Sequence, residues 1–146
     1  MDSLSQHSEE QNKLDLRSLS FEELSEELAS MGEKPFRAKQ VFSWVHEKQA
    51  TDFTEMTDLS KGLREALSER FFLTVLKQVD VLVSRLDGTR KYLFGLADGN
   101  VIESVRMQYR HGNSVCISSQ VGCRMGCRFC ASTLDGLVRG LTASEM

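Results

Sequence analysis

The first half of the chain places its apolar residues at helical spacing. Ser20 and Glu23 form a capping box that begins one amphipathic helix, and Gly32 provides its stop. Pro35 can open a second helix, and a third is expected over residues 60–70. The apolar stripes consist of Phe21, Leu24, Leu28 and Met31, then Ala38, Val41, Phe42 and Val45, and then Leu59, Leu63, Ala66 and Leu67. Because three short helices can bury these stripes against one another, the pattern predicts a small helical domain.

The period of the pattern changes to two near residue 79, which is typical of β-strands. Apolar and polar residues alternate over residues 79–83 and 92–96, and Asp-Gly dipeptides at 87–88 and 98–99 mark turns. The alternation continues over residues 101–109. An antiparallel β-meander is therefore expected to follow the helices.

A glutamate lies within the third alternating run. Glu103 shares a face with Val101, Val105, Met107 and Tyr109. If that face is buried, the carboxylate needs a partner or a raised pKa, which makes Glu103 a candidate acid or base. The alternative is a glutamate whose side chain reaches solvent, and the strand pattern alone favours this alternative.

These patterns divide the chain into three parts and indicate an α+β fold. Residues 1–19 form a polar segment with little periodicity, which is expected to be mobile at its start. Residues 20–78 form the helical domain. Residues 79–146 contain the meander, a short strand around residues 114–118 and the start of a further domain.

The composition narrows the class of protein. The chain has 146 residues, a formal net charge of −3 and 40% hydrophobic residues, as a soluble globular protein does. No apolar run approaches the roughly 20 residues needed to cross a bilayer, and the N-terminus has no signal-peptide core, so we expect a cytoplasmic protein. The basic cluster Lys34, Arg37 and Lys39 could contact nucleic acid or could be ordinary solvated surface. The negative net charge argues against strong nonspecific binding of nucleic acid.

All four cysteines, Cys116, Cys123, Cys127 and Cys130, lie late in the sequence. In a reducing cytosol such crowding indicates metal or redox chemistry rather than a fold held by disulfides. The last three form a C-x3-C-x2-C motif, and three thiolates on one loop can bind three irons of a cubane cluster while the fourth iron stays open. A non-catalytic zinc module with all four cysteines is the alternative, although a ligand seven residues before the motif is awkward for a compact site.

The cysteine motif, with Phe129 just before its last cysteine, resembles the signature of the radical S-adenosylmethionine superfamily. Longer strings around it resemble the adenine-C2 methyltransferases of large-subunit ribosomal RNA. Those strings are S-V-C-I-S-S-Q-V-G-C-R-M-G-C-R-F-C-A-S-T, L-V-R-G-L-T-A-S-E, G-E-K-P-F-R-A-K-Q-V-F-S-W-V and D-G-T-R-K-Y-L-F-G-L-A-D-G-N-V-I-E-S-V. The resemblance extends over about residues 20–146.

This resemblance implies two cofactors. Cys123, Cys127 and Cys130 would hold a [4Fe-4S] cluster whose open iron binds S-adenosylmethionine, and Phe129 would lie near the adenine of that cofactor. Reductive cleavage would give a deoxyadenosyl radical, which takes hydrogen from a methyl group carried on a distant cysteine. The resulting methylene radical would add to C2 of the target adenine, because this carbon is too poor a nucleophile for simple displacement.

The resemblance also implies roles outside the cysteine motif. The Cys116 thiol would help to release a covalent RNA intermediate, and Glu103 would occupy an acid–base position. Large-subunit ribosomal RNA is the implied substrate, with transfer RNA as a second candidate, and the implied electron donor is a protein such as flavodoxin or ferredoxin. A disulfide bond, a monomeric state and no association with membranes are further implications. A related adenine-C8 methyltransferase shares the motif string and remains an alternative.

The end of the sequence suggests a longer protein. Thr142 and Glu145 form another capping box, so a helix is expected to begin near Ala143, although the sequence stops at Met146. We therefore expect the N-terminal part of an enzyme. The strands after residue 100 would belong to an incomplete radical-SAM (β/α) barrel, of which this chain holds the first strand and the cluster loop. Cys116 is the one cysteine outside the motif, so the methyl-carrying cysteine is missing and these 146 residues alone are expected to be inactive.

Overall fold

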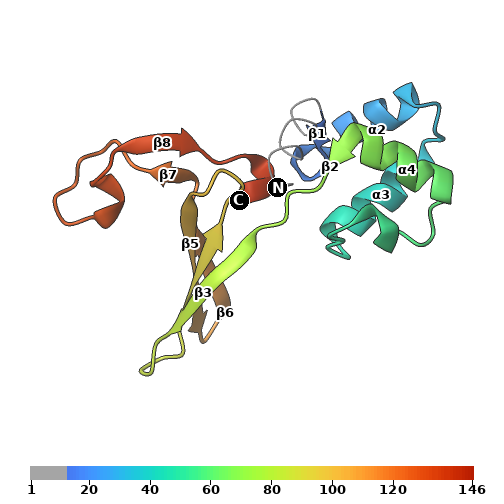
Figure 1. The fold of residues 1–146 in the computed structure, drawn as a ribbon. Coiled ribbons are helices and arrows are strands. Elements are labelled where there is room, and N and C mark those ends of the chain that lie inside the picture. The colour runs from blue at the N-terminus through green and yellow to red at the C-terminus, as the bar shows by residue number, and fades with distance from the viewer. Residues whose placement is uncertain (1–12) are drawn as a thin grey trace, which may run out of the picture. The chain divides into compact units, whose positions relative to one another are not determined.

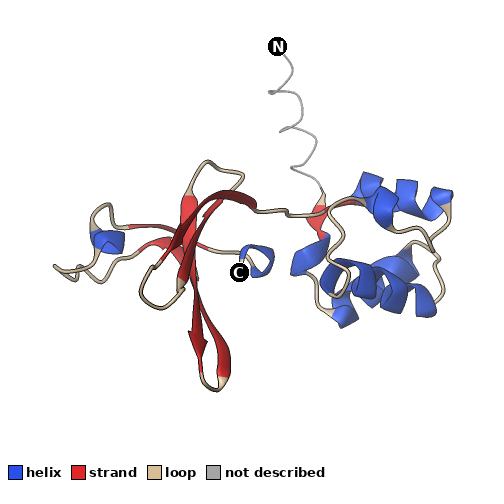
Figure 2. Ribbon diagram, turned by 90° about the horizontal axis from the view of Figure 1, so that it is seen from below, coloured by secondary structure: helices blue, strands red, loops and turns tan. Residues whose placement is uncertain are grey.

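The computed structural model describes residues 13–146. One compact unit extends to Val75, and a second runs from Leu76 to Met146. Helices lie mostly in the first unit and strands mostly in the second (Figure 1, Figure 2). The sequence pattern places the boundary slightly later, after residue 78. The mobility expected at the start of the chain concerns residues outside the described part.

The first unit contains the three predicted helices. They are α2 (Phe21–Ser30), α3 (Phe36–His46) and α4 (Lys61–Arg70), accompanied by the 3-10 turns η2 (Leu16–Ser18) and η3 (Phe53–Glu55). The capping box of α2 is confirmed, because the Ser20 hydroxyl accepts from the Glu23 N–H at 3.2 Å and the Glu23 carboxylate accepts from the Ser20 N–H at 2.8 Å. Pro35 precedes α3, and Ser60 caps α4. Among the described helices, none is long and apolar enough to cross a bilayer.

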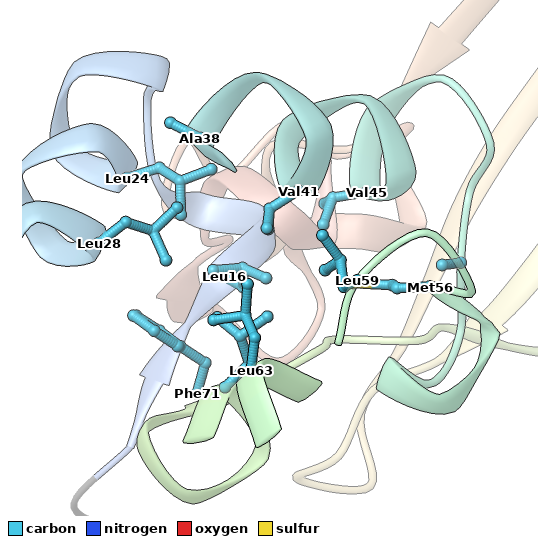
Figure 3. Packing of buried hydrophobic residues seen from close by; sticks show 12 residues of the cluster. Leu16, Leu24, Leu28, Ala38, Val41, Val45, Met56, Leu59, Leu63 and Phe71 are labelled. Carbon is cyan, nitrogen blue, oxygen red and sulfur yellow. The ribbon is translucent and has the colours of Figure 1, made fainter. Parts of the chain in front are cut away.

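The helices enclose an apolar core. Figure 3 shows side chains from α2, α3, α4 and the connecting segments pointing toward one another. The buried residues are Leu16, Leu24, Leu28, Ala38, Val41, Val45, Ala50, Met56, Leu59, Leu63, Leu67 and Phe71. Most of the predicted stripe positions are among them, whereas Phe21 remains 41% exposed. The prediction from their spacing is therefore confirmed, because the apolar stripes of the three helices pack into one shared core.

The helical unit begins earlier than the sequence pattern predicts. The start expected at residue 20 is too late, because β1 (Leu14–Asp15) pairs in parallel with β2 (Phe71–Phe72). Leu16, directly after β1, is 1% exposed. A segment this short has too few apolar residues to show a period, so its burial depends on partners that are distant in the sequence.

The second unit is built on the predicted meander. Its strands are β3 (Lys77–Val83), β4 (Arg90–Gly95), β5 (Val101–Tyr109) and β6 (Gly112–Ile117), hydrogen-bonded in that order. Each neighbouring pair is antiparallel. A second, two-stranded sheet pairs β7 (Gln120–Gly122) with β8 (Leu137–Gly140), also antiparallel. Leu96, Ile102 and Val121 form the buried core of this unit.

The expected parallel barrel is not seen in β5 and β6. Assigning these strands to it is wrong, because short turns reverse the chain directly, whereas a parallel pair needs a crossover of a dozen or more residues. β7, which directly precedes the cysteine motif, was not predicted from the sequence, and it pairs antiparallel with β8. The capping box between Thr142 and Glu145 is confirmed, and the turn that it begins, Ala143–Glu145, is a single 3-10 turn.

Candidate functional site

The cysteine loop, residues 123–136, joins β7 to β8 and is closed at its base. The Cys123 N–H donates to the Gly136 carbonyl at 2.9 Å. Gly122 lies against this closure with a φ of 72°, and a Cβ at its position would lie 2.0 Å from the Gly136 oxygen. Because no side chain fits in that space, glycine at position 122 allows the two ends of the loop to meet.

Thr133 ties the other two motif cysteines together. Its hydroxyl lies 2.8 Å from the Cys130 carbonyl and 3.0 Å from the Cys127 carbonyl, and it can donate to either. The Cys130 N–H donates to the Cys127 carbonyl at 3.1 Å. Each of the three motif cysteines therefore has at least one backbone group held by a hydrogen bond within the loop.

The thiols of Cys123, Cys127 and Cys130 are free and half-buried. Thiolates are soft ligands that suit iron–sulfur clusters and zinc, so the donor set fits the cluster that the motif predicts. Within residues 13–146 the structure gathers no group of three His, Cys, Asp or Glu side chains that could hold a metal ion. The loop thus provides the donors and fixes much of their backbone.

Cys116 is exposed on β6, which is the last strand of the meander. The register pairs it with Val105 on β5, so Cys116 and Glu103 lie on the same face of the sheet as diagonal neighbours. The described residues assemble neither the three motif cysteines nor all four cysteines into a metal-binding group, so the four-cysteine zinc module stays the alternative. All four cysteines are free, and the implied disulfide bond stays a prediction.

Glu103 reaches solvent, as the alternative interpretation of its strand holds. Its side chain is 56% exposed, and its carboxylate pairs with the Lys91 Nζ at 3.0 Å. The buried residue of β5 is Ile102, which points to the opposite face and packs with Leu96 and Val121. Burial of the Glu103 face, on which the acid–base interpretation of the strand pattern depends, is therefore not met, and the solvent-exposed alternative that the strand pattern favours is the one seen.

One cavity brings together predicted site residues from the meander and the cysteine loop. It has a volume of about 570 Å³, and Glu103, Cys123 and Cys130 are among the residues that line it. A volume of this size can hold a small organic ligand. Three of the predicted site residues therefore border one space, while the other predicted site residues lie outside its lining.

Phe129 projects from the cysteine loop with 95% of its surface exposed. Two other apolar residues of the loop, Met125 and Leu134, are 75% and 80% exposed. An exposed aromatic ring can stack on a flat heteroaromatic ring such as adenine. The position of Phe129 is compatible with the role that the resemblance implies, and that role stays a prediction.

Arg139 anchors the C-terminal end of the loop, a role that the sequence analysis missed. Its Nε donates to the Asp98 carboxylate at 2.7 Å, and its terminal nitrogens donate to the Glu145 carboxylate at 2.7 Å and 2.8 Å. The hydrogen bond from Arg139 lowers the pKa of Asp98 to about 2 and also lowers the pKa of Glu145. β8 is thereby joined to the turn before β5 and to the last residues of the sequence.

Thr133 was missed as well, although the sequence holds a signal for it. A threonine that follows a turn residue by three positions often donates its hydroxyl to that residue's backbone, and Thr133 follows Cys130 by three. No comparable local signal exists for Arg139, because its partners are distant in the sequence or become neighbours only when the last turn forms.

Part of the chain matches a described protein family. Residues 14–73 match the family described as the Ribosomal RNA large subunit methyltransferase N-terminal domain. This range begins at β1 and ends just after β2, so it covers the helical unit as the structure shows it.

The chain is also similar to curated proteins over most of its length. It is 58% identical over 134 residues to the probable dual-specificity RNA methyltransferase RlmN of Lachnoclostridium phytofermentans. It is 60% identical over 132 residues to the protein of the same name from Lachnospira eligens. The alignments cover 92% and 90% of this chain but 38% of each relative.

A solved structure has a similar fold. The crystal structure of a radical SAM methyltransferase from Sphaerobacter thermophilus matches with a TM-score of 0.80 and 45% sequence identity. The match covers 91% of this chain and 39% of that one. The chain therefore spans less than half the length of the proteins that it resembles.

Proposed function

Because the chain corresponds to the N-terminal portion of RlmN-type radical S-adenosylmethionine methyltransferases, we propose that it takes part in methylating C2 of an adenine in large-subunit ribosomal RNA. The observation that carries this proposal is the closed loop of three free thiols beside a cavity, in a chain 58% identical to a protein named as an RNA methyltransferase. The name of that relative describes it as dual-specificity, and we propose transfer RNA, which the resemblance implies, as the second substrate. We place the reaction in the cytoplasm.

The cysteine loop is the proposed cofactor site. Cys123, Cys127 and Cys130 would hold a [4Fe-4S] cluster, and S-adenosylmethionine would bind its open iron. These cofactors, when bound, supply the radical chemistry that an unreactive carbon such as adenine C2 requires. The chain's own contribution is to hold the three thiols on a loop closed at its base and to present Phe129 to the adenine of the cofactor.

Two residues on one face of the meander would act on the RNA. The exposed Cys116 thiol is accessible to a covalent RNA intermediate and would help to release it. Glu103, oriented by its ion pair with Lys91, would exchange a proton with the substrate. The strand register supports this pairing of roles, because it makes Cys116 and Glu103 diagonal neighbours.

A methyl-carrying cysteine is required in addition. The sequence has four cysteines, of which three are assigned to the cluster and Cys116 to release of the product. One cysteine cannot carry the methyl group and also resolve the adduct that forms from it. These 146 residues alone are therefore proposed to be inactive, and the complete enzyme is proposed to act as a monomer with a flavodoxin or ferredoxin as electron donor.

The test is methylation by the complete enzyme under anaerobic conditions. The enzyme, loaded with iron and sulfide, would receive a reductant, S-adenosylmethionine and a fragment of large-subunit ribosomal RNA. Mass spectrometry of the nucleosides should show 2-methyladenosine, and transfer RNA in a parallel reaction tests the second substrate. Formation of 8-methyladenosine would establish the related C8 activity instead, and no methylated adenine in either RNA would contradict the proposal.

A further inference from the structure

We propose that Thr133 is a positioning residue for the cluster, holding the backbone of Cys127 and Cys130 in place before the cluster binds. This inference rests on the proposed function of the cysteine loop as a cluster site. It adds a residue that ligates no metal and that the cysteine spacing does not reveal.

The contacts of Thr133 reach two of the proposed ligands from one side chain. The hydroxyl lies 2.8 Å from the Cys130 carbonyl and 3.0 Å from the Cys127 carbonyl, so one proton can be shared between two acceptors. The Thr133 N–H also donates to the Cys130 carbonyl at 3.3 Å. Since Thr133 is half-buried, water competes less for these bonds than at an exposed turn.

The loop has little else to fix these two cysteines. The apolar side chains around them, Met125, Phe129 and Leu134, are 75%, 95% and 80% exposed, so packing does not hold this part of the loop. The closure between Cys123 and Gly136 fixes the base and leaves the far part free of that constraint. Hydrogen bonding from Thr133 is therefore the main restraint that links Cys127 to Cys130 beyond the single bond between their own backbones.

Threonine suits this role better than serine does. Its γ-methyl group restricts χ1, so the hydroxyl loses less rotational freedom when it bonds to the two carbonyls. Valine has nearly the same shape and the same restriction but no hydroxyl. The pair of substitutions Thr133→Val and Thr133→Ser therefore separates the hydrogen bond from the shape of the side chain.

The test measures how firmly the cluster is held. The complete enzyme and its variants would be reconstituted anaerobically, and the rate at which a ferrous chelator removes iron would be followed by absorbance. Thr133→Val should lose iron about five times faster or more, as expected for one lost hydrogen bond, and Thr133→Ser should stay within about twofold of the unsubstituted enzyme. Thr89→Val is the matched control, because it removes a threonine hydroxyl bonded to Asp87 in a distant hairpin turn and should change nothing.

Hydrogen exchange of the complete enzyme without its cluster provides a second measurement. Thr133→Val should speed exchange in residues 127–134 and leave the meander unchanged, which distinguishes a loosened loop from a misfolded unit. Equal iron loss from the Thr133→Val and unsubstituted enzymes, or a Thr133→Ser variant as defective as Thr133→Val, would overturn the role of Thr133 alone. An unsubstituted enzyme that takes up no iron and sulfide would overturn the proposed function and this inference together.

Discussion

At the scale of single residues, exposure separates two roles for a cysteine in a strand. A cysteine that serves only for packing belongs to the most buried class of residue. Cys116 is exposed on β6, on the same face as the Glu103 carboxylate. A thiol in this position contributes little to the core of the unit and is free to meet a substrate, so its loss should affect chemistry rather than folding.

Cys116→Ala in the complete enzyme should retain the cluster and cleave S-adenosylmethionine but accumulate RNA covalently attached to the protein. The adduct can form without the thiol, whereas its release requires it. Gel electrophoresis after reaction with labelled RNA measures the adduct, and we expect steady-state turnover to fall at least about 100-fold. Ser114→Ala, on the same strand and face, is the control that should turn over normally. Normal turnover by Cys116→Ala without an adduct would contradict a role in release.

At the scale of elements, the cysteine loop depends on how closely β7 and β8 approach. Gly122 and Gly126 both adopt positive φ angles, 72° and 67°, so a side chain at either position is strained. They differ in their surroundings, because a Cβ at Gly122 would collide with the Gly136 oxygen, whereas a Cβ at Gly126 would meet nothing within 4 Å. Comparing substitutions at the two positions therefore measures how much the loop closure contributes to the free energy of unfolding.

Gly122→Ala should destabilise the second unit by about 2 kcal/mol or more, because the backbone must move and the bond from Cys123 to Gly136 is lost. Gly126→Ala should cost only the conformational strain, about 1 kcal/mol. Chemical denaturation of the two variants measures the difference. Equal destabilisation would mean that the close approach at Gly122 contributes nothing to stability.

The ion pairs of Arg139 make the attachment of β8 sensitive to pH. Since the folded-state pKa of Asp98 is lowered to about 2 from 3.8, its stabilising contribution is present above pH 3.8 and disappears as the pH falls toward about 2. Glu145 shifts in the same direction. Arg139→Met should therefore cost about 1 kcal/mol at neutral pH, since Arg139 and Asp98 keep about a third of their side-chain surface in water, and almost nothing below pH 2. Urea unfolding at the two pH values measures this cost, and a cost that grows on acidification would contradict the assignment.

Local signals in the sequence predict most of the elements but not their distant contacts. Ser20, Glu23 and the apolar stripes are sufficient to locate the helices because caps and periodicity depend on neighbours along the chain. The burial of Leu16 could not be predicted, because it depends on which distant surface covers the segment. The antiparallel pairing of β5 with β6 was missed for a different reason, since the resemblance to a barrel enzyme outweighed the short turn between them.

In the candidate site too, the spacing of residues along the sequence predicts some features, whereas others follow only from contacts in the folded structure. The cysteine spacing selects Cys123, Cys127 and Cys130, and the structure places all three, with free thiols, on one loop. The contacts that shape the loop involve Thr133 and Arg139, whose importance follows from hydrogen bonds rather than from residue type. Sequence analysis therefore finds the ligating atoms more readily than the groups that position them.

At the scale of the whole molecule, the two units differ in how much core they contain. The helical unit buries twelve apolar residues in one cluster, whereas the second unit buries Leu96, Ile102 and Val121. Apolar residues of β6 remain at the surface, where Val115 is 63% exposed and Ile117 is 49% exposed. Burial of apolar surface is the main source of stability, so the helical unit should be the more stable of the two.

The rate of hydrogen exchange in the 146-residue chain should therefore differ between the two units. We expect slow exchange in α2, α3 and α4, and rapid exchange from Ser114 to Met146, where few apolar contacts oppose local opening. Mass spectrometry of proteolytic peptides locates the protected amides. Cooperative protection across residues 114–146, equal to that of the helices, would show that the second unit is stable without further partners.

The central claim is that three cysteines of one loop hold an iron–sulfur cluster and that Cys116 takes no part in binding it. The most direct measurement is the iron, zinc and acid-labile sulfide content of the anaerobically reconstituted complete enzyme, with each of the four cysteines replaced by Ala in turn. We predict that Cys123→Ala, Cys127→Ala and Cys130→Ala lose both iron and sulfide and that Cys116→Ala retains both. Loss of the metal from Cys116→Ala as well, or zinc without sulfide in the unsubstituted enzyme, would contradict the claim and support a four-cysteine zinc site.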